Sequence, residues 1–509
     1  MKHALSILLL IISIKASLAQ GGFNKVYPPG IGTFTGCVGP NNTYLAAGQV
    51  PLGGGYIGAY LVLVDSIGNI IKTDTVTHPS RSLKPGLWGS AHFKNGYYWI
   101  AGQAYLRGWI AKLKPNLDTV WSKVFRFEDS INTVLHGSLV IEDEKFIVTG
   151  TASAVPPWDT IGRRSLYLAE FDSTGKRIWE HNYFAPEPTG QAMWQWGSQV
   201  MGSPDGGYLI AGSRAEEGNG NNSIDKLLVK TDSLGNKVWE VTFGSNYSDP
   251  EAIIQNLSDS TFLSVSTLTA PKKPTLQPHY YDGYILVEIR KYQDGSVIYS
   301  DTLLPYYPGN AIFSVVHNSN GDWSILGVFY PEILQPHDPN RPYSWGSYIL
   351  RLDQDLDSVW YRDIVIYDTL GGDNILYDLR ATPDNGMVAF GYAADLGKPS
   401  EMWIAKTDSM GCVVDGCHTV SVPELTLSND LLSVYPNPVG SIVTLTGSQE
   451  LKGKPLKIKL FSLDGTLADQ KENIQLPYNY NLINLKSGAY ILQYEHKGEI
   501  LGQSKIIKL

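Results

Sequence analysis

The sequence predicts an all-β protein, a seven-bladed β-propeller followed by a small C-terminal Ig-like β-sandwich. Glycine (51 residues), tyrosine (30) and tryptophan (13) are abundant among the 509 residues, as expected for many turns and half-buried strands. A strand-turn-strand unit recurs seven times, and the repeat stops after His418. Charged residues make up only 17% and the net charge is −9, which excludes disorder caused by charge excess and argues against nucleic acid as a partner.

The chain begins with the features of a secretory signal peptide, which we place at residues 1–19. A basic start precedes an apolar stretch from Ala4 to Ile14, and small residues lead to cleavage after Ala19. This stretch is too short to span a bilayer, which needs ~20 apolar residues, and no transmembrane segment is expected elsewhere. Residues 20–30 form a short lead, and whether they add a strand to the propeller stays open.

The seven repeats occupy residues 31–420, and their spacing predicts the architecture. Successive copies lie 49 to 61 residues apart when the turn of each copy is taken as the reference. These turns fall at Asp65, Lys114, Asp172, Asp232, Tyr292, Asp353 and Asp408. In most copies a strand ending in glycine precedes the turn unit, at Gly48, Gly102, Gly150, Gly212, Gly327 and Gly391. With one more apolar strand before it, each copy holds four strands, which is typical of a propeller blade.

Most of these turns read Asp-Ser-x-Gly. The Asp side chain accepts a hydrogen bond from the backbone two residues on, and the Gly takes a left-handed conformation. Aromatic residues follow at the same place in successive copies, and we expect them to pack blade against blade: Trp121, Trp179, Trp239, Tyr299 and Trp360. Asp353, Asp355 and Asp357 have calcium-loop spacing, but Ser358 replaces the required glycine and Ile364 the required glutamate. We therefore expect a plain turn and no metal there.

The chain has three cysteines, Cys37, Cys412 and Cys417. In an oxidising compartment Cys412 and Cys417 are close enough in sequence to form a disulfide. Two free thiols remain an alternative, and a zinc site that also uses His418 is a weaker one because it lacks a fourth ligand. No cofactor is expected.

A different pattern follows the repeats. Residues 421–430 read as a linker, and residues 431–509 alternate apolar and polar positions in strands that predict a small β-sandwich. Its motifs are a Tyr435-Pro436-Asn437-Pro438 opening, a strand ending in the turn Asp464-Gly465, a return that contains Gly488 and Tyr490, and a short Lys505–Leu509 end.

These motifs resemble the type A C-terminal sorting domain of the type IX secretion system of Bacteroidota. The resemblance implies export to the periplasm by the signal peptide, recognition by the type IX secretion machinery, and a final location in the medium or on the outer-membrane surface. It implies nothing about the activity of the cargo. The segment Asp205-Gly206-Gly207-Tyr208 also resembles the Asp-Gly-Gly-Tyr repeat propellers common among such cargo.

Long connections after the second strand of several blades, and between blades, predict a binding face on one side of the ring. Aromatic side chains and arginines suit sugar rings or peptides, because a flat apolar face and forked donors recognise both. The rim candidates are Trp158, Arg163, Trp194, His279, Tyr281, Arg341, Tyr343 and Trp345. A second set at the starts of the innermost strands would surround the channel mouth: Trp88, His136 and Trp196.

No catalytic motif stands out, so catalytic residues are not assigned. We expect a ligand-binding or adhesion module, or a scaffold, whose ligand is a glycan or a protein. The alternative is an extracellular hydrolase or lyase that acts on polysaccharide or peptide at the channel mouth. A pair of catalytic carboxylates is defined by its separation in space, which the sequence does not show.

Overall fold

The computed structural model divides into two compact units, Met1–Asp415 and Gly416–Leu509, and each is considered by itself. The residues it describes are 22–79, 81–86, 90–127, 132–141, 144–153, 164–184, 193–216, 224–245, 249, 251–270, 282–303, 311–329, 345–367, 372–414, 431–448, 451–462, 466–497 and 499–509.

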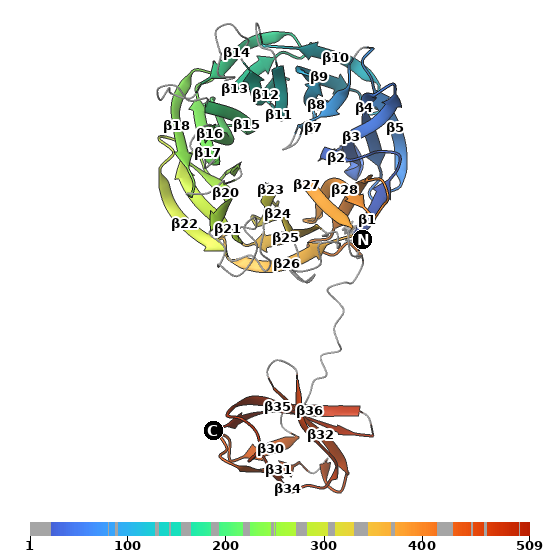
Figure 1. The fold of residues 1–509 in the computed structure, drawn as a ribbon, viewed down its shortest axis with the longest axis vertical. Coiled ribbons are helices and arrows are strands. Elements are labelled where there is room, and N and C mark those ends of the chain that lie inside the picture. Colours follow the sequence, from blue (N-terminus) through green and yellow to red (C-terminus); the bar gives the residue numbers. More distant parts are fainter. Residues whose placement is uncertain are drawn as a thin grey trace, which may run out of the picture. The chain divides into compact units, whose positions relative to one another are not determined.

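Within these residues the first unit is a seven-bladed β-propeller, as predicted (Figure 1). Each blade is an antiparallel sheet whose four strand positions run from the central channel to the rim. The innermost strands are β2 (Thr33–Val38), β6 (Leu83–Pro85) with β7 (Ala91–Lys94), β11 (Asn132–Val140), β15 (Met193–Gly202), β19 (Ile253–Asn256), β23 (Ala311–His317) and β27 (Asp373–Ala381). A short 3-10 helix, η1 (Pro40–Asn42), follows β2.

The next two positions complete the middle of each blade. The second strands are β3 (Tyr44–Gly53), β8 (Tyr97–Ala104), β12 (Phe146–Ser153), β16 (Tyr208–Glu216), β20 (Thr261–Ala270), β24 (Trp323–Phe329) and β28 (Met387–Ala394). The third strands are β4 (Tyr56–Val64), β9 (Arg107–Leu113), β13 (Arg164–Phe171), β17 (Ile224–Thr231), β21 (Asp282–Lys291), β25 (Gly346–Leu352) and β29 (Glu401–Thr407).

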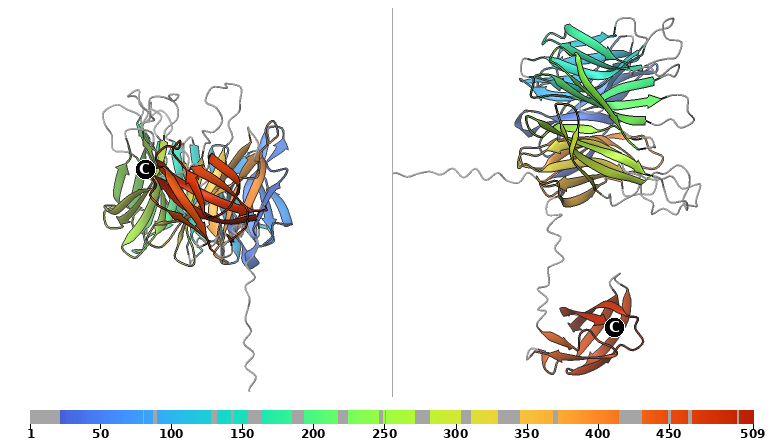
Figure 2. Two further views of the ribbon diagram at one scale, coloured as in Figure 1. Left: turned by 90° about the horizontal axis from the view of Figure 1, so that it is seen from below. Right: turned by 90° about the vertical axis from the view of Figure 1, so that its left-hand side faces the viewer.

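The outermost strands are β5 (Ile70–Val76), β10 (Thr119–Phe125), β14 (Arg177–Tyr183), β18 (Lys237–Phe243), β22 (Val297–Leu303), β26 (Ser358–Ile364) and, in blade 7, β1 (Phe23–Tyr27). The strands of each blade run between two faces of the ring, seen from the side in Figure 2. We call turn face the side that carries the turns from first to second and from third to fourth strand. The loop face is the opposite side.

The amino-terminal strand closes the ring. β1 pairs with β29, Phe23 opposite Lys406 and Tyr27 opposite Met402, and so becomes the outermost strand of blade 7. The repeat pattern had placed that strand after the turn at Asp408, and the propeller was expected to begin at residue 31. Both expectations are wrong. The outermost strand of blade 7 is β1, and the propeller begins at Phe23. The last blade is therefore built from both ends of the body.

The recurring glycine of the second strand has a steric cause. At the glycine's level the innermost strand carries a β-bulge, with register shifts such as Leu135/Gly137 in blade 3 and Leu376/Asp378 in blade 7. A Cβ on Gly150 or Gly391 would overlap the backbone of the bulged strand. The glycine therefore marks the place where two strands approach too closely for a side chain; in blade 6 a Cβ on Gly327 would instead meet the Tyr348 ring.

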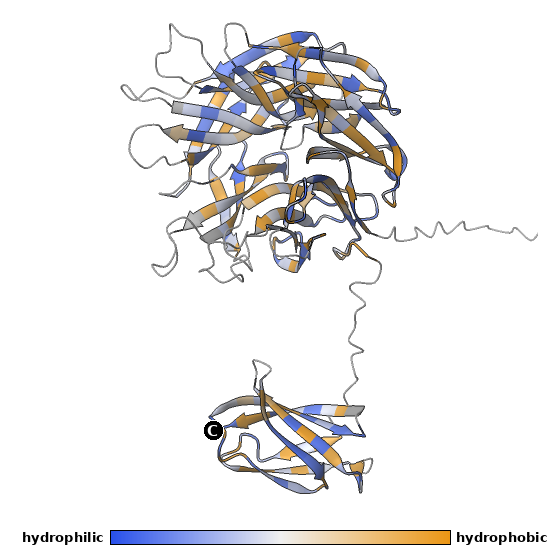
Figure 3. Ribbon diagram, turned by 45° about the vertical axis from the view of Figure 1, so that its right-hand side comes forward, coloured by the Kyte–Doolittle hydropathy of each residue, from blue (hydrophilic) through white to orange (hydrophobic). Residues whose placement is uncertain are grey.

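The core lies between blades. Buried apolar side chains form one cluster at each of the seven interfaces between neighbouring blades, and apolar residues recur along the strands in Figure 3. At the turn face, basic side chains from third strands reach carboxylates in the inner turns of their own blade. The pairs are Lys230 with Asp205 at 2.8 Å, Lys406 with Asp384 at 2.8 Å and Arg351 with Asp322 at 3.1 Å.

Most joints between blades follow one rule, which confirms the packing role predicted for most of the recurrent aromatics. An aromatic ring on the outermost strand lies against the turn glycine of the next blade, so that a Cβ on that glycine would come within 2.6–3.1 Å of the ring. The pairs are Phe23–Gly68, Trp121–Gly175, Trp179–Gly235, Trp239–Gly295 and Trp360–Gly411. The ring closure repeats this geometry: Tyr27 donates a hydrogen bond to the Gly68 carbonyl, as Tyr183 does to that of Gly235.

Two joints differ. The turns of blades 2 and 6 hold a leucine in the glycine's place, Leu117 at φ 68° and Leu356 at φ 71°, and both leucines are buried. The outermost strands that precede them carry Lys72 and Tyr299. Tyr299 is 40% exposed. It does not pack against a turn glycine of the next blade as the four tryptophans do, so its predicted packing role is wrong.

The second unit contains two sheets around one core, in agreement with the predicted small sandwich. One sheet is β30 (Leu432–Tyr435), β31 (Ile442–Gly447) and β34 (Tyr478–Asn481). The other is β33 (Leu467–Ile474), β32 (Leu456–Ser462), β35 (Gly488–His496) and β36 (Glu499–Lys508). The turn expected at Asp464-Gly465 and the linker 421–430 lie outside the described residues.

Candidate functional site

The bulges of the innermost strands lead to the candidate site. A bulge leaves one residue without a partner on the neighbouring strand and changes the direction of its side chain. The residues at this position are Phe34, His136, Ser198, Phe313 and Tyr377. In blades 6, 7 and 1, which are consecutive around the ring, all three are aromatic and only partly buried.

These aromatic side chains form a continuous cluster, which we call the aromatic wall. The Tyr377 ring lies 5.1 Å from that of Phe313, in an edge-to-face arrangement, and 6.1 Å from that of Phe34. Tyr392, on the second strand of blade 7, lies 6.0 Å from Tyr377. The separations are those of favourable aromatic pairs, so the wall is a preformed, partly accessible aromatic surface at the inner edge of three blades.

One carboxylate accompanies the aromatic wall. Asp373 is the first residue of β27 and therefore lies at the loop-face end of that strand. Burial raises its pKa above the ordinary value, and its charge in turn raises the pKa of Tyr377 and of Tyr392, for both of which burial is the largest cause. Trp345, a predicted rim residue that is 39% exposed, forms a β-bridge with Asp373. The bridge is a backbone pairing, so the loop-face end of β27 carries the Asp373 carboxyl group next to the backbone of Trp345.

The other side of the channel is more polar. His136 occupies the bulge of blade 3, and burial lowers its pKa to about 4, so the imidazole is neutral at pH 7. Trp196 donates a hydrogen bond of 2.6 Å to Glu251 of the next blade. Trp194 is covered by the Arg164 guanidinium, 4.5 Å above its ring. Each of these tryptophans thus has a charged partner from a neighbouring blade, whereas the rings of the aromatic wall contact one another.

The predicted site residues fall into two groups, those that the structure describes and those that it does not. His136, Trp194, Trp196 and Trp345 are described, and the structure does not bring them into one cluster. The others lie outside the described residues: Trp88, Trp158, Arg163, His279, Tyr281, Arg341 and Tyr343. Sequence reasoning missed Phe34, Phe313, Tyr377 and Tyr392. The position of the second-strand glycine could have located the first three, because the bulge that it permits lies opposite.

The structure also locates several other residues for which the sequence predicted a chemical role. Cys412 is disulfide-bonded, and its expected partner, Cys417, lies outside the described residues. Cys37 is free and buried, and burial raises the pKa of its thiol to about 12. In the Asp353 turn the side chain accepts hydrogen bonds from the Asp355 and Asp357 backbone, which is the expected turn chemistry. No group of three or more potential metal ligands, and no helix able to cross a membrane, occurs in the described ranges.

The opening and closing motifs of the second unit form one site. The Asn437 side chain donates to the Lys505 carbonyl (2.7 Å) and accepts from the Ile507 amide (2.8 Å). Tyr435 is 77% exposed, and Ile507 and Leu509 are exposed nearby on the same pair of segments. Gly488 begins β35. Tyr490 is buried and donates a hydrogen bond to the Lys486 carbonyl.

Residues 433–508 match the family model described as a secretion system C-terminal sorting domain. The resemblance seen in the sequence is therefore confirmed for this unit. Such a domain implies interaction with the type IX secretion machinery and secretion across the outer membrane, to the surface or the medium. No curated protein matches the chain.

Several solved structures are similar to the propeller. The WD40 domain of Neurospora crassa Pan2 has a TM-score of 0.43 and 10% identity, and the match covers 76% of this chain and 96% of that one. A GH93 α-L-arabinofuranosidase of Fusarium graminearum has a TM-score of 0.38 and 10% identity, covering 76% and 97%. An α-L-arabinanase of Penicillium chrysogenum has a TM-score of 0.36 and 11% identity, covering 76% and 98%. At these low values the three structures say nothing about what this chain binds.

Proposed function

We propose that the chain is an exported binding protein of Bacteroidota, whose propeller recognises an extracellular carbohydrate at the aromatic wall. In this proposal residues 1–19 direct export to the periplasm, and the sorting unit directs passage through the outer membrane to the medium or the cell surface. The observation that carries the binding role is the presence of aromatic residues at three consecutive bulges, Phe313, Tyr377 and Phe34.

The chemistry of the aromatic wall favours a sugar over a peptide. A sugar ring has an apolar C–H face that packs against an aromatic ring, and its hydroxyl groups pair with a few polar side chains at the edge. Asp373 and the two tyrosine hydroxyls supply such groups beside the Phe313 and Phe34 rings. Aromatic surface that stays partly exposed to water costs free energy, and a ligand that covers it removes this cost.

The test is glycan-array binding of the full mature chain, followed by calorimetry on any hit. Tyr377→Ala and Phe313→Ala are expected to weaken binding at least about tenfold, because each removes a stacking surface worth about 1.5 kcal/mol or more. Tyr105→Ala is the matched control: Tyr105 is 65% exposed and lies in the connection from the second to the third strand of blade 2, on the loop face. Equal binding by all variants would contradict the proposal.

A hydrolase or lyase is the second candidate, and Asp373 is the observation that favours it. A carboxyl group whose pKa is raised by burial is suited to act as a general acid at neutral pH. If the body is an enzyme, Asp373→Asn abolishes turnover of a polysaccharide that the wild type degrades and leaves its binding largely intact. A wild type that binds a glycan without cleaving it would rule out this candidate for that glycan.

We further propose that the exposed side chains around Asn437 are what the secretion machinery contacts. Asn437 links the opening motif to the last strand, so Asn437→Ala is expected to separate them and to lower the amount of protein exported. The measurement compares the cell-associated and released chain by immunoblot. Asn479→Ala is the control, since the Asn479 side chain accepts a hydrogen bond from Thr444 on the neighbouring strand of its own sheet and contacts neither Lys505 nor Ile507 in the hydrogen bonds described. Unchanged export of Asn437→Ala would contradict this assignment.

A further inference from the structure

We propose that the turn face carries a second binding site, a cavity between blades 6, 7 and 1 that takes a neutral, hydroxyl-bearing ligand of mono- or disaccharide size. This inference is independent of the aromatic wall, because the wall lies at the bulges within the innermost strands, whereas the cavity lies at the turn-face ends of those strands. The cavity has a volume of about 560 Å³, within the usual range of small-molecule sites.

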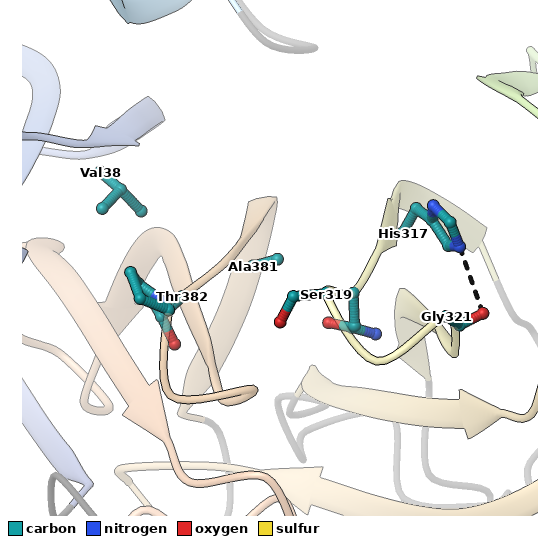
Figure 4. A pocket seen from close by; sticks show the side chains of 8 residues that line it. Val38, His317, Ser319, Gly321, Ala381 and Thr382 are labelled. Carbon is teal, nitrogen blue, oxygen red and sulfur yellow. Dashed lines mark hydrogen bonds between the residues drawn. The ribbon is translucent and has the colours of Figure 1, made fainter. Parts of the chain in front are cut away.

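The walls of the cavity differ in character (Figure 4). Val38 and Ala381, with Pro383, supply apolar surface from the innermost strands of blades 1 and 7 and the turn of blade 7. His317 and Ser319 supply polar surface from the end of β23 and the following turn in blade 6. An apolar wall opposite a polar wall matches a sugar ring, which presents C–H groups on one side and hydroxyl groups at its edge.

An unsatisfied buried amide points to a missing ligand. Asn318 lines the cavity and is 2% exposed. Its Nδ2 donates to the Asp322 carbonyl at 3.1 Å and to Ser324 Oγ at 2.9 Å, whereas its Oδ1 has no hydrogen-bond partner within the described residues. A buried acceptor left unpaired costs about 1–3 kcal/mol. Because this oxygen is fully buried, the Asn318 amide must turn toward the cavity before a ligand hydroxyl can reach it, and the hydrogen bond then removes this cost.

The same position in other blades shows that the fold does not require this arrangement. In blades 4 and 7 the turn begins with Ser203 and Thr382, whose hydroxyls donate to the turn carboxylates Asp205 and Asp384. Those turns are closed by their own residues. Blade 6 has Asn318 instead, and its acceptor oxygen stays open. Blade 6 is one of the three blades that border the cavity, and Thr382 of blade 7, whose hydroxyl is already paired, lines it as well.

The imidazole of His317 is held in place beforehand. Its ring stacks on Trp323 at 4.3 Å with an interplanar angle of 23°, and its Nε2 pairs with the Gly321 carbonyl at 3.2 Å (Figure 4). None of the described residues that line the cavity is Asp, Glu, Lys or Arg. The site therefore has no fixed charge to neutralise an ionic ligand, and a charged one would lose hydration without compensation.

The experiment measures binding of neutral sugars to the full mature chain by calorimetry and ligand-observed NMR. The probes are glucose, galactose, N-acetylglucosamine and their β-linked disaccharides, with glucuronic acid as the charged comparator. Ser319→Trp fills the cavity from an exposed position, and Ser319→Ala is its matched control. We expect Ser319→Trp to abolish binding, Ser319→Ala to change it less than about threefold, and His317→Ala and Asn318→Ala each to weaken it about tenfold.

Two further comparisons separate this site from the proposed function. Tyr377→Ala removes part of the aromatic wall and is expected to leave binding at the turn face unchanged, whether or not the wall itself binds a glycan. Glucuronic acid is expected to bind at least about tenfold more weakly than its neutral counterpart. The proposal is overturned if no neutral sugar binds the wild type, or if Ser319→Trp and His317→Ala both bind as tightly as the wild type. Because Ser319 and His317 are exposed, these variants keep the test valid even if Asn318→Ala does not fold.

Discussion

The ring consists of two sectors that differ in their joints and in the sites they carry. Blades 2 to 5 are held together by three tryptophan–glycine joints, and blades 6, 7 and 1 by Trp360–Gly411 and Phe23–Gly68. The two boundaries between the sectors are the leucine joints, at Leu117 and Leu356. The aromatic wall and the turn-face cavity both belong to the three-blade sector.

The comparison shows two solutions to one packing problem. Between blades, space must be filled next to a turn that needs a left-handed residue. A glycine leaves room for an aromatic ring from the preceding blade, whereas a leucine fills the space itself and accepts backbone strain. Where the leucine is present, the preceding strand carries Lys72 or Tyr299 and no tryptophan. The aromatic and the glycine therefore act as a pair, and the variants below test that pairing.

The largest effect is expected from Gly235→Val. Gly235 has φ 81°, and a Cβ there would lie 2.6 Å from His181 Cδ2 and 2.7 Å from Trp179 Cζ3. Backbone strain and overlap together should lower the free energy of unfolding by about 3–5 kcal/mol. Urea unfolding followed by circular dichroism measures it. Gly206→Val is the control, because that glycine has φ 81° with no atom within 4 Å of a Cβ. Equal losses in the two variants would show that strain alone matters.

A somewhat smaller effect is expected from Trp179→Ala, which empties a glycine joint. Loss of a large, partly buried aromatic side chain should cost about 2–4 kcal/mol. Tyr299→Ala, at a leucine joint, should cost less than about 1 kcal/mol, because Tyr299 is 40% exposed. Thermal unfolding of both variants measures the difference. If Tyr299→Ala were as damaging as Trp179→Ala, the two kinds of joint would be equivalent and the comparison would fail.

The pairing itself can be tested at Leu356. Leu356→Gly relieves a strained left-handed residue but removes a buried side chain, so a net loss of about 2 kcal/mol is expected. Adding Tyr299→Trp should recover about 1 kcal/mol by supplying the ring that a glycine joint uses. A double-mutant cycle from urea unfolding gives the coupling energy. A coupling energy near zero would show that aromatic and glycine do not act together.

The smallest effect concerns the bulge residues, which are aromatic in one sector and include His136 and Ser198 in the other. The folded-state pKa of His136 is lowered to about 4, below the ~6.5 of an unfolded histidine. Because the folded protein favours the neutral imidazole, the free energy of unfolding is highest above the unfolded-state pKa. It falls as the pH drops from that pKa toward the folded-state pKa. We expect protonation of His136 on unfolding to lower the free energy of unfolding by about 1–2 kcal/mol between pH 7 and pH 5. In His136→Gln this part of the pH dependence should disappear.

The sequence predicted the features that depend on local or repeated chemistry. The number of blades, the Asp-Ser-x-Gly turns and the packing of Trp121 and Trp179 follow from spacing and turn preferences. Tyr299 was assigned by analogy with them and differs, because its role depends on a residue in the next blade, Leu356. The motifs of the second unit were also found separately, and only the structure shows that Asn437 joins the first motif to the last strand.

The aromatic wall could not be predicted, because it is a product of closure. Phe34 and Tyr377 stand at opposite ends of the body's sequence and become neighbours only when β1 completes blade 7. The sequence by itself therefore determined the kind of fold, its repeat and the sorting unit, all of which follow from the period of turns and strands. Tertiary structure alone decided which blades meet at the closure and which side chains the bulges bring together, because those contacts join residues with no local relation in the chain.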